Sequence, residues 1–267
     1  MTGEATQVLP LSVGLRELLS RSPLLLFLDV DGTLAPIAPR PEEAAVPERT
    51  RKLVARLAAL DGVEVSLVSG RAARDARRMV GVTQVWAVGN HGFESIGPDG
   101  EELVDPSVAP FEQQLVRVAG ELRSMFQGIT GVLVEDKRWT LSVHYRLADP
   151  SVVPRVRSAV LRMAAEVGLL VHEGKMVLEV RPPVDVNKGT AVLALAERLG
   201  GSDGAVVFIG DDRTDEDAFR AIRRRWHRSL TVRVVAGDPV PSEAEFRVEG
   251  TEGARDLLEQ ILHLRTR

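Results

Sequence analysis

The stretch LLLFLDVDGT, residues 24–33, places two aspartates directly behind five consecutive apolar residues. A continuous apolar run of this length predicts a strand that is buried on both faces, as in parallel sheets. In open α/β sheets, ligands bind just beyond the carboxyl ends of the strands. We therefore expect Asp29 and Asp31 to lie at a functional site if other segments bring matching chemistry to the same edge.

The composition is that of a globular protein. Of the 267 residues, 44% are hydrophobic and 27% are charged, the net charge is −4, and there is no cysteine. The acidic balance argues against a nucleic-acid-binding surface, and the missing cysteine excludes disulfides and thiolate sites. No apolar run is long enough for a membrane span, and the N-terminal segment lacks the pattern of a secretion signal. We expect a cytoplasmic monomer without nucleic-acid or membrane partners.

Strand and helix patterns alternate along two segments of the chain. The predicted strands are 24–28, 63–70, 85–92, 205–210 and 230–237. The predicted helices are 47–60, 71–80, 187–200, 214–225 and 251–265. This alternation is typical of an α/β fold with a doubly wound parallel sheet.

Between these segments the pattern changes, and a helix followed by a strand pair occurs twice. The predicted helices are 108–126 and 149–168, and the strand pairs are 131–146 and 169–182, the second turning near Gly174. The sequence therefore predicts a smaller α+β cap domain, residues 108–182. It is inserted into a Rossmann-like core formed by residues 1–107 and 183–267.

Polar residues of the core fall at predicted strand ends and at the start of a helix. They are Asp29, Asp31, Ser69, Lys188, Asp211 and Asp212. Any one of these signals alone is more typical of a turn, since Asp-Gly and Ser-Gly pairs are common there. Their joint occurrence at converging strand ends favours a shared site.

The chemistry of these residues fits phosphoryl transfer. Asp29 can act as a carboxylate nucleophile, and Asp31 can protonate the leaving alcohol and then deprotonate the attacking water. Asp29 and Asp211, with or without Asp212, offer the hard oxygen ligands that Mg²⁺ prefers. The Ser69 hydroxyl and the Lys188 ammonium can bind the phosphoryl oxygens, together with backbone amides.

Four core motifs resemble those of the haloacid dehalogenase-like phosphatases: DVDGTL (29–34), LVSGR (67–71), NKG (187–189) and GDDRTDE (210–216). Further stretches resemble trehalose-6-phosphate phosphatases in particular: GNHG (89–92), EDK (135–137), HYR (144–146) and EVRPP (179–183). The resemblance extends from about Leu24 to the last predicted helix. It implies an Mg²⁺-dependent hydrolase of trehalose biosynthesis that converts trehalose 6-phosphate to trehalose through an aspartyl-phosphate.

The resemblance also implies individual roles. Asp29 is then the nucleophile and Asp31 the acid/base, and the metal is held by Asp29, the Asp31 main-chain carbonyl and Asp211. Ser69 and Lys188 match the phosphate-binding positions. Whether Asp212 binds the metal or orients Lys188 stays open, as do the roles of Arg71 and His91.

In the cap, the resemblance implies that Glu135, Lys137 and Glu179 bind sugar hydroxyls. Ser142, His144 and Arg146 alternate with apolar residues and are expected to share one face of a strand; the roles of His144 and Arg146 stay open. The core motifs do not distinguish trehalose 6-phosphate from other sugar phosphates, such as sucrose phosphate or mannosyl-phosphoglycerate. A catalytically silent regulatory domain is a further alternative, against which the complete set of core residues argues.

Overall fold

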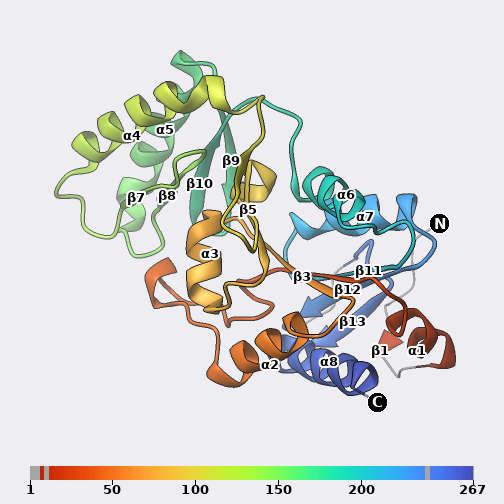
Figure 1. Cartoon of the computed structure of the whole chain (residues 1–267). Helices are drawn as coiled ribbons and strands as arrows, with labels where there is room; N and C mark the ends of the chain where they lie inside the picture. Colours follow the sequence, from red (N-terminus) through yellow and green to blue (C-terminus); the bar gives the residue numbers. More distant parts are fainter. Residues whose placement is uncertain (1–6, 9–11, 238–240, 267) are drawn as a thin grey trace. The chain divides into compact units, whose positions relative to one another are not determined.

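The computed structural model describes residues 7–8, 12–237 and 241–266. Most of the N-terminal segment, on which the expectation of no secretion signal depends, lies outside these residues. The chain divides into two compact units, Met1–Leu103 with Val186–Arg267, and Val104–Asp185. The second, here called the insert unit, interrupts the sequence of the first, the core unit (Figure 1). In the described part of the chain no helix is long and apolar enough to cross a membrane.

The core unit is built on a sheet of nine described strands in the order β1-β13-β12-β11-β2-β3-β4-β5-β6. All pairs from β1 to β4 are parallel, whereas β4 and β5 are antiparallel. The strands are β1 (Gln7–Val8), β2 (Leu24–Leu28), β3 (Val63–Val68), β4 (Trp86–Gly89), β5 (Glu94–Ile96), β6 (Glu102–Val104), β11 (Ala205–Gly210), β12 (Ser229–Val235) and β13 (Phe246–Glu249). The predicted Rossmann-like α/β core is confirmed.

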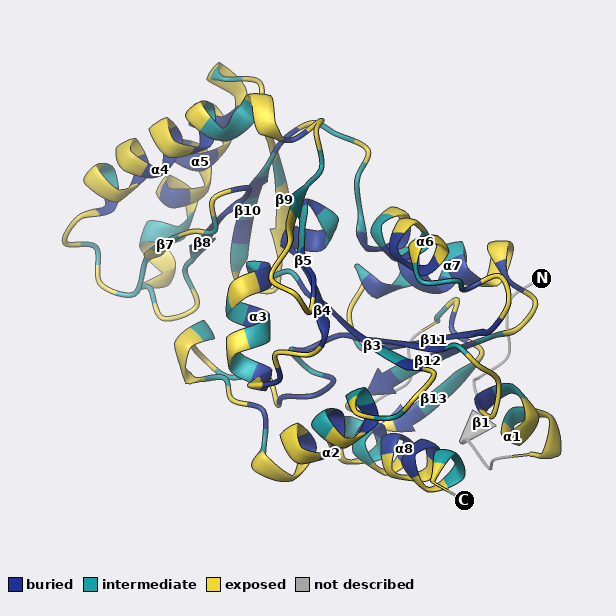
Figure 2. Ribbon diagram, viewed as in Figure 1, coloured by how far each residue is buried: buried dark blue, intermediate teal, exposed yellow. Residues whose placement is uncertain are grey.

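Helices cover both faces of this sheet. On one face pack α1 (Val13–Leu19), α2 (Glu48–Ala58), α3 (Ala73–Val80) and α8 (Gly250–Arg265), and on the other α6 (Lys188–Arg198) and α7 (Asp215–Arg225). The side chains of strand β2 pack on both sides. Leu24, Leu26 and Leu28 pack on the face covered by α1, α2, α3 and α8, and Leu25 and Phe27 pack on the face covered by α6 and α7. Figure 2 shows β3, β4 and β11 as similarly buried along most of their length.

Some core elements differ from the predictions. The helix predicted at 71–80 begins at Ala73, so Arg71 lies in the preceding loop. The strand predicted at 85–92 ends at Gly89, because Asn90 and His91 adopt left-handed φ values of 49° and 59° that cannot continue a strand. The chain also forms α1, β1, β5, β6 and β13, which the pattern did not predict.

The insert unit is a four-stranded antiparallel sheet in the order β7-β8-β10-β9 with two helices. Its elements are α4 (Glu112–Phe126), β7 (Leu133–Asp136), β8 (Leu141–His144), α5 (Val153–Glu166), β9 (Leu170–Gly174) and β10 (Val177–Arg181). Apolar residues of β8 and β10, such as Val143 and Val180, form a separate core with Leu122 and Val160 of the helices. The other face carries polar side chains together with the exposed Leu133 and Leu170. Short 3-10 helices complete the chain: η1 (Pro41–Glu43), η2 (Asn90–Gly92), η3 (Ala109–Phe111) and η4 (Pro150–Val152).

Candidate active site

The core site lies at the carboxyl ends of three neighbouring parallel strands. Asp211 follows β11, Asp29 follows β2, and Ser69 follows β3, the strands being adjacent in that order. The Asp29 amide donates to the Ile209 carbonyl at 2.9 Å, which ties the end of β2 to the end of β11. Sequence segments far apart therefore reach one edge of the sheet, as the strand-end rule predicts.

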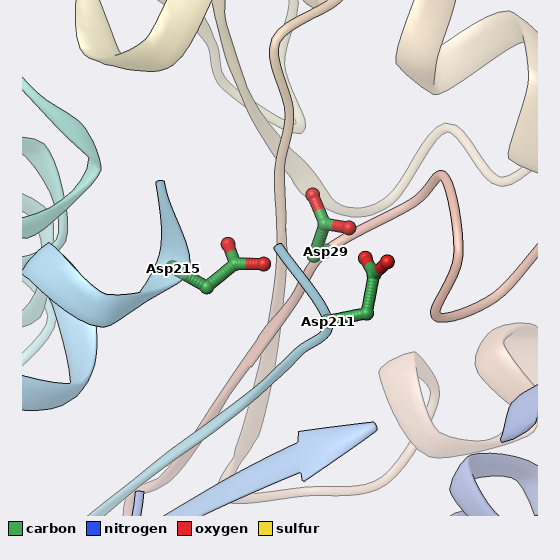
Figure 3. Close-up of side chains that lie close together, drawn as sticks. All are labelled: Asp29, Asp211 and Asp215. Carbon is green, nitrogen blue, oxygen red and sulfur yellow. The ribbon is translucent and has the colours of Figure 1, made fainter. Parts of the chain in front are cut away.

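A buried lysine joins two of the aspartates. Lys188 Nζ donates to Asp29 Oδ1 at 2.6 Å and to Asp215 Oδ1 at 2.7 Å, and the Lys188 side chain is 3% exposed. One carboxylate oxygen from each of Asp29, Asp211 and Asp215 lies within 4.8 Å of the others. Figure 3 shows these three carboxylates together, carried by two segments that are distant in the sequence.

Local structure explains how Lys188 and Asp215 reach the site. Asn187 caps α6 by accepting from the Thr190 amide at 3.1 Å, and Thr190 Oγ1 accepts from the Asn187 amide at 3.0 Å. This capping box begins the helix so that Lys188 is its first residue. Asp215 begins α7, and its Oδ2 accepts from the Asp212 amide at 2.9 Å.

Two glycines allow the backbone to approach these carboxylates closely. A Cβ atom at Gly32, where φ is +87°, would collide with the Asp211 carboxylate. A Cβ at Gly210 would collide with that of Asp215. The glycines are therefore required by space at both positions, and at Gly32 also by the left-handed backbone.

Burial and mutual repulsion raise the carboxyl pKa values. Burial raises the pKa of Asp29 well above its ordinary value, with Lys188 opposing and the charges of Asp215 and Asp211 adding to the effect. Burial and the neighbouring Asp215 raise the pKa of Asp211 to about 7. Burial alone would lower the pKa of Lys188, but the charges of Asp215 and Asp29 outweigh it and raise that pKa above its ordinary value. Lys188 is therefore a permanent cation.

The cluster has the composition of a divalent-cation site. Three carboxylates and one ammonium leave two uncompensated negative charges when all are ionised. Asp211 Oδ1 is buried and has no hydrogen-bond partner, although burying an unpaired carboxylate oxygen is costly. Hard oxygen donors of this kind suit Mg²⁺ or a similar cation. The residues present thus fit a bound metal ion.

Asp31 lies outside this cluster and pairs with Arg71. Arg71 Nε and Nη2 donate to Asp31 Oδ2 and Oδ1, each at 2.7 Å, in a two-pronged ion pair. Ser69 Oγ accepts from the Arg71 amide at 3.1 Å, which leaves the Ser69 hydroxyl proton for another acceptor. The metal role expected of Asp31 concerns its main-chain carbonyl and stays a prediction.

Sequence reasoning missed Asp215. Asp212, the candidate for orienting Lys188, is exposed, and its amide is a donor to Asp215, which contacts Lys188 directly. The signal was present in GDDRTDE, whose later aspartate opens a helix. His91, whose role was left open, belongs to a loop held against Ser69: the His91 amide donates to the Ser69 carbonyl at 3.0 Å.

In the insert unit, four polar residues form one row across the sheet. Glu135, Ser142, Glu179 and His172 are direct cross-strand neighbours on β7, β8, β10 and β9. They lie on the face opposite the helices, because the intervening apolar residues belong to the core.

Ion pairs and a histidine–carboxylate hydrogen bond connect this row to its neighbours. Lys137 Nζ lies 3.7 Å from Glu179 Oε1, and His144 Nε2 lies 2.9 Å from Glu135 Oε2. Arg181, which sequence reasoning did not single out, donates through Nε to Glu179 Oε2 at 2.8 Å. The three predicted sugar-binding residues therefore lie on one polar face.

Arg146 lies beyond the strand on which its expected face depends, so that expectation stays a prediction. Strand β8 ends at His144, and the chain then turns, with the Ala148 amide donating to the Tyr145 carbonyl at 3.1 Å. Arg146 instead donates to the Lys175 carbonyl at 3.2 Å. Alternation predicts a common face only as far as the strand continues.

Comparison with known proteins identifies the family. The trehalose-phosphatase family model matches residues 27–252. A trehalose-phosphate phosphatase of Mycolicibacterium paratuberculosis is 40% identical over 200 residues, which are 74% of this chain and 51% of that protein. A Mycobacterium tuberculosis protein named uncharacterized glycosyl hydrolase is 38% identical over 214 residues, 78% of this chain but 16% of that protein.

The chain thus matches about half the length of the mycobacterial phosphatase and a small part of the longer protein. Among solved structures, a trehalose-6-phosphate phosphatase related protein superposes with a TM-score of 0.79 at 28% identity. That match covers 91% of this chain and 98% of the other. The family match spans the Asp29, Lys188 and Asp211 motifs as well as the insert unit. The chain belongs to the trehalose-phosphatase family.

Proposed function

We propose that this protein is a phosphatase that hydrolyses trehalose 6-phosphate to trehalose and inorganic phosphate. The observation that carries the proposal is the buried Asp29–Lys188–Asp215 arrangement beside Asp211, in a chain of this family. In this proposal the core unit is the catalytic domain and the insert unit is a cap that selects the sugar.

In the first step, an Asp29 carboxylate oxygen attacks phosphorus and the bond from phosphorus to the sugar oxygen breaks. Asp31 gives its proton to that oxygen, so that trehalose leaves as a neutral alcohol. Lys188 holds Asp29 at 2.6 Å and fixes the direction of attack. The Ser69 hydroxyl proton donates to a phosphoryl oxygen and stabilises the charge there.

In the second step, water attacks the aspartyl-phosphate and the bond from phosphorus to Asp29 breaks. Asp31, now a carboxylate, accepts the proton of this water. Asp29 returns to its ionised form beside Lys188, and inorganic phosphate is the product. The two steps together consume one water and regenerate both aspartates.

Asp29 and Asp211, with the Asp31 carbonyl, would hold Mg²⁺, and Asp215 would complete the carboxylate set. When bound, the ion supplies positive charge that favours ionised Asp29 and Asp211 and offsets the charge of the phosphoryl oxygens. This fits the raised pKa values of both aspartates, which reflect their burial without such a charge.

The sugar would be recognised by Glu135, Lys137 and Glu179 of the insert unit. A disaccharide presents many hydroxyl groups and little apolar surface, so charged side chains on one sheet face are suitable partners. The cross-strand row and its ion pairs hold these side chains in fixed positions before the substrate binds.

Phosphate release from a panel of substrates tests the proposal. The panel is trehalose 6-phosphate, sucrose 6-phosphate, glucose 6-phosphate, mannosyl-3-phosphoglycerate and 4-nitrophenyl phosphate. We expect kcat/KM to be highest for trehalose 6-phosphate. Activity should require Mg²⁺, and the Asp29→Asn variant should have no activity. A higher kcat/KM for another sugar phosphate would replace the proposed substrate. Unchanged turnover in Asp29→Asn would exclude the covalent mechanism.

A further inference from the structure

The mechanism above leaves Arg71 without a part, although it contacts one of the reacting groups. Both oxygens of the Asp31 carboxylate accept from its guanidinium, each at 2.7 Å. The Arg71 side chain is 17% exposed and that of Asp31 is 36% exposed. An ion pair with two short parallel hydrogen bonds fixes orientation more strictly than a single contact between point charges.

Arg71 is itself held at several points of the core unit. Its amide donates to Ser69 Oγ at 3.1 Å, and its carbonyl accepts from the Asn90 amide at 2.7 Å. Its Nη2 also donates to the Pro41 carbonyl at 3.0 Å. The Arg71 backbone therefore contacts the residues that follow β3 and β4, and its guanidinium contacts the segment after β2 that carries Asp31 and Pro41. A side chain anchored in this way is suited to hold another group still.

We propose that Arg71 is a positioning residue for Asp31, an inference that rests on the proposed two-step phosphatase mechanism. A carboxylate oxygen has two acceptor positions, and Arg71 occupies one on each oxygen. The second positions are not used by Arg71, so one of them can carry the proton that Asp31 gives to the leaving oxygen and can later accept the proton of water. Arg71 thus orients the two remaining acceptor positions of the Asp31 carboxylate. It also prevents the partly exposed Asp31 side chain from rotating away. Proton transfer depends steeply on such alignment.

Two other roles for Arg71 make different predictions. If Arg71 bound the phosphate directly, its removal would weaken every phosphate monoester and would still matter in the absence of Asp31. If it served only the fold, its removal would lower stability and would affect all substrates equally. A residue that acts through Asp31 matters most when the leaving oxygen needs a proton.

The test compares two leaving groups. Purified Arg71→Ala, Arg71→Gln and Arg71→Lys are assayed in Mg²⁺ buffer for kcat/KM. The substrates are 4-nitrophenyl phosphate and the sugar 6-phosphate that the wild-type protein hydrolyses fastest. The nitrophenolate leaves without protonation, whereas the sugar alkoxide does not. We expect Arg71→Ala and Arg71→Gln to lose about 10- to 100-fold on the sugar phosphate but less than about threefold on the aryl phosphate. Arg71→Lys, which cannot donate in the same fork, should fall between them and wild type.

Two controls complete the experiment. Arg74→Ala removes a neighbouring arginine of α3 that pairs with Glu102 at the surface, and it should stay within about twofold of wild type on both substrates. In an Asp31→Asn background, adding Arg71→Ala should change the sugar-phosphate value by less than about twofold, because the two residues act as one unit.

Equal losses on both substrates, or a full further loss in the Asp31→Asn background, would overturn the positioning role. Using whichever sugar phosphate is fastest keeps this outcome separate from the substrate proposal. Slow hydrolysis of trehalose 6-phosphate alone would count against the substrate. A leaving-group-independent Arg71 effect would count against the inference.

Discussion

Asp215 is the residue that lets the core unit bury a lysine. With Asp215 removed, Lys188 would keep one short contact, to Asp29, and would lose its other charged partner in a buried environment. Removing one partner of a buried ion pair is far more costly than removing a surface charge, because the remaining charge has lost its water as well.

Because Lys188 keeps Asp29 as a charged partner, the loss is that of one buried hydrogen bond between charged groups, and we expect Asp215→Ala to lower the free energy of unfolding by about 1.5–3 kcal/mol. Activity should also fall, since Asp215 then no longer fixes the position from which Lys188 contacts Asp29. Chemical denaturation by urea, followed by circular dichroism, measures the change. Asp217→Ala is the matched control: this aspartate lies in the same first turn of α7, but its side chain is 44% exposed and pairs with Arg220. Its effect should stay within about 0.5 kcal/mol, and equal losses in the two variants would contradict the prediction.

Asp211 makes the stability of the metal-free protein depend on pH. Its pKa is about 7 in the folded protein, against 3.8 as the ordinary value, so between these limits the folded state binds more protons than the unfolded chain. The contribution of Asp211 to the free energy of unfolding then falls as pH rises from about 4 to about 7. Asp29, with its raised pKa, acts in the same direction.

Thermal unfolding in EDTA between pH 5 and pH 7.5 checks this dependence. Other groups titrate in this range, so the comparison is with Asp211→Asn, which removes the Asp211 contribution and leaves the rest. We expect the melting temperature of wild type to fall more over this range than that of the variant. Identical pH profiles would show that Asp211 is already ionised in the metal-free protein.

At the scale of elements, the insert sheet separates its two faces by function. Leu178 and Val180 of β10 join the apolar core, whereas Glu179 between them lies in the polar row. A substitution on the polar face should therefore change recognition with little effect on packing. The same residue type on the helix-facing side provides a comparison, because Glu173 of β9 pairs with Arg157 of α5.

Glu179→Ala should lower kcat/KM for trehalose 6-phosphate by about ten- to a hundredfold, the equivalent of about 1.5–3 kcal/mol for a lost hydrogen bond to a charged group. Hydrolysis of 4-nitrophenyl phosphate, which has no sugar, should stay nearly unchanged. Glu135→Ala and Lys137→Ala should behave alike, and Glu173→Ala should leave both substrates unaffected. Parallel losses on the two substrates would mean that the polar row supports the fold and does not select the sugar.

Sequence patterns predicted the strands that are buried along their whole length. Strands β2 and β11 are enclosed on both faces, so their continuous apolar runs could be recognised. Strand β5 could not, because Glu94-Ser95-Ile96 is short and mostly polar and is held by its antiparallel pairing with β4. Such a strand depends on a partner that the local sequence does not specify.

The candidate site follows the same logic. Asp29, Ser69 and Asp211 could be predicted because each comes directly after a strand. The three strands are neighbours in the sheet, so their ends lie side by side. Asp215 depends on the path of the four residues after β11, which returns the start of α7 to Lys188. The Asp31–Arg71 pair likewise joins two loops. The spacing of apolar residues, from which strands and helices were predicted, contains no information about such a contact.

For the whole molecule, a bound divalent cation should act as a stabilising ligand. Two buried carboxylates and a partly buried one face one ammonium, so an added cation relieves repulsion in the folded state, whereas the unfolded chain holds no such cluster. We expect Mg²⁺ at a hundredfold excess over its Kd to raise the free energy of unfolding by about 2.7 kcal/mol. At one fixed Mg²⁺ concentration, the rise should be larger at pH 7.5 than at pH 5, where Asp211 is protonated and the Kd is higher.

Thermal unfolding with and without MgCl2, at an ionic strength matched with NaCl, measures this effect. Asp211→Asn should reduce the shift and Asp217→Asn should not. A melting temperature that does not respond to Mg²⁺ in wild type would show that the carboxylate cluster binds no such ion.

The pairing of β2 with β11 also affects the order in which parts of this protein can fold during synthesis. Leu24 is the register partner of Ala205, 181 positions further along, so the ribosome releases one strand long before its neighbour. The two strands cannot pair until both have been synthesised, and domains tend to fold in the order of synthesis. The insert unit is formed by one continuous segment of the chain and has its own core. It can therefore fold before β11 has been synthesised to pair with β2. A nascent chain that stops before Gly210 carries Asp29 and Lys188 but still lacks Asp211 and Asp215. The site for chemistry is thus among the last parts of the molecule to be completed.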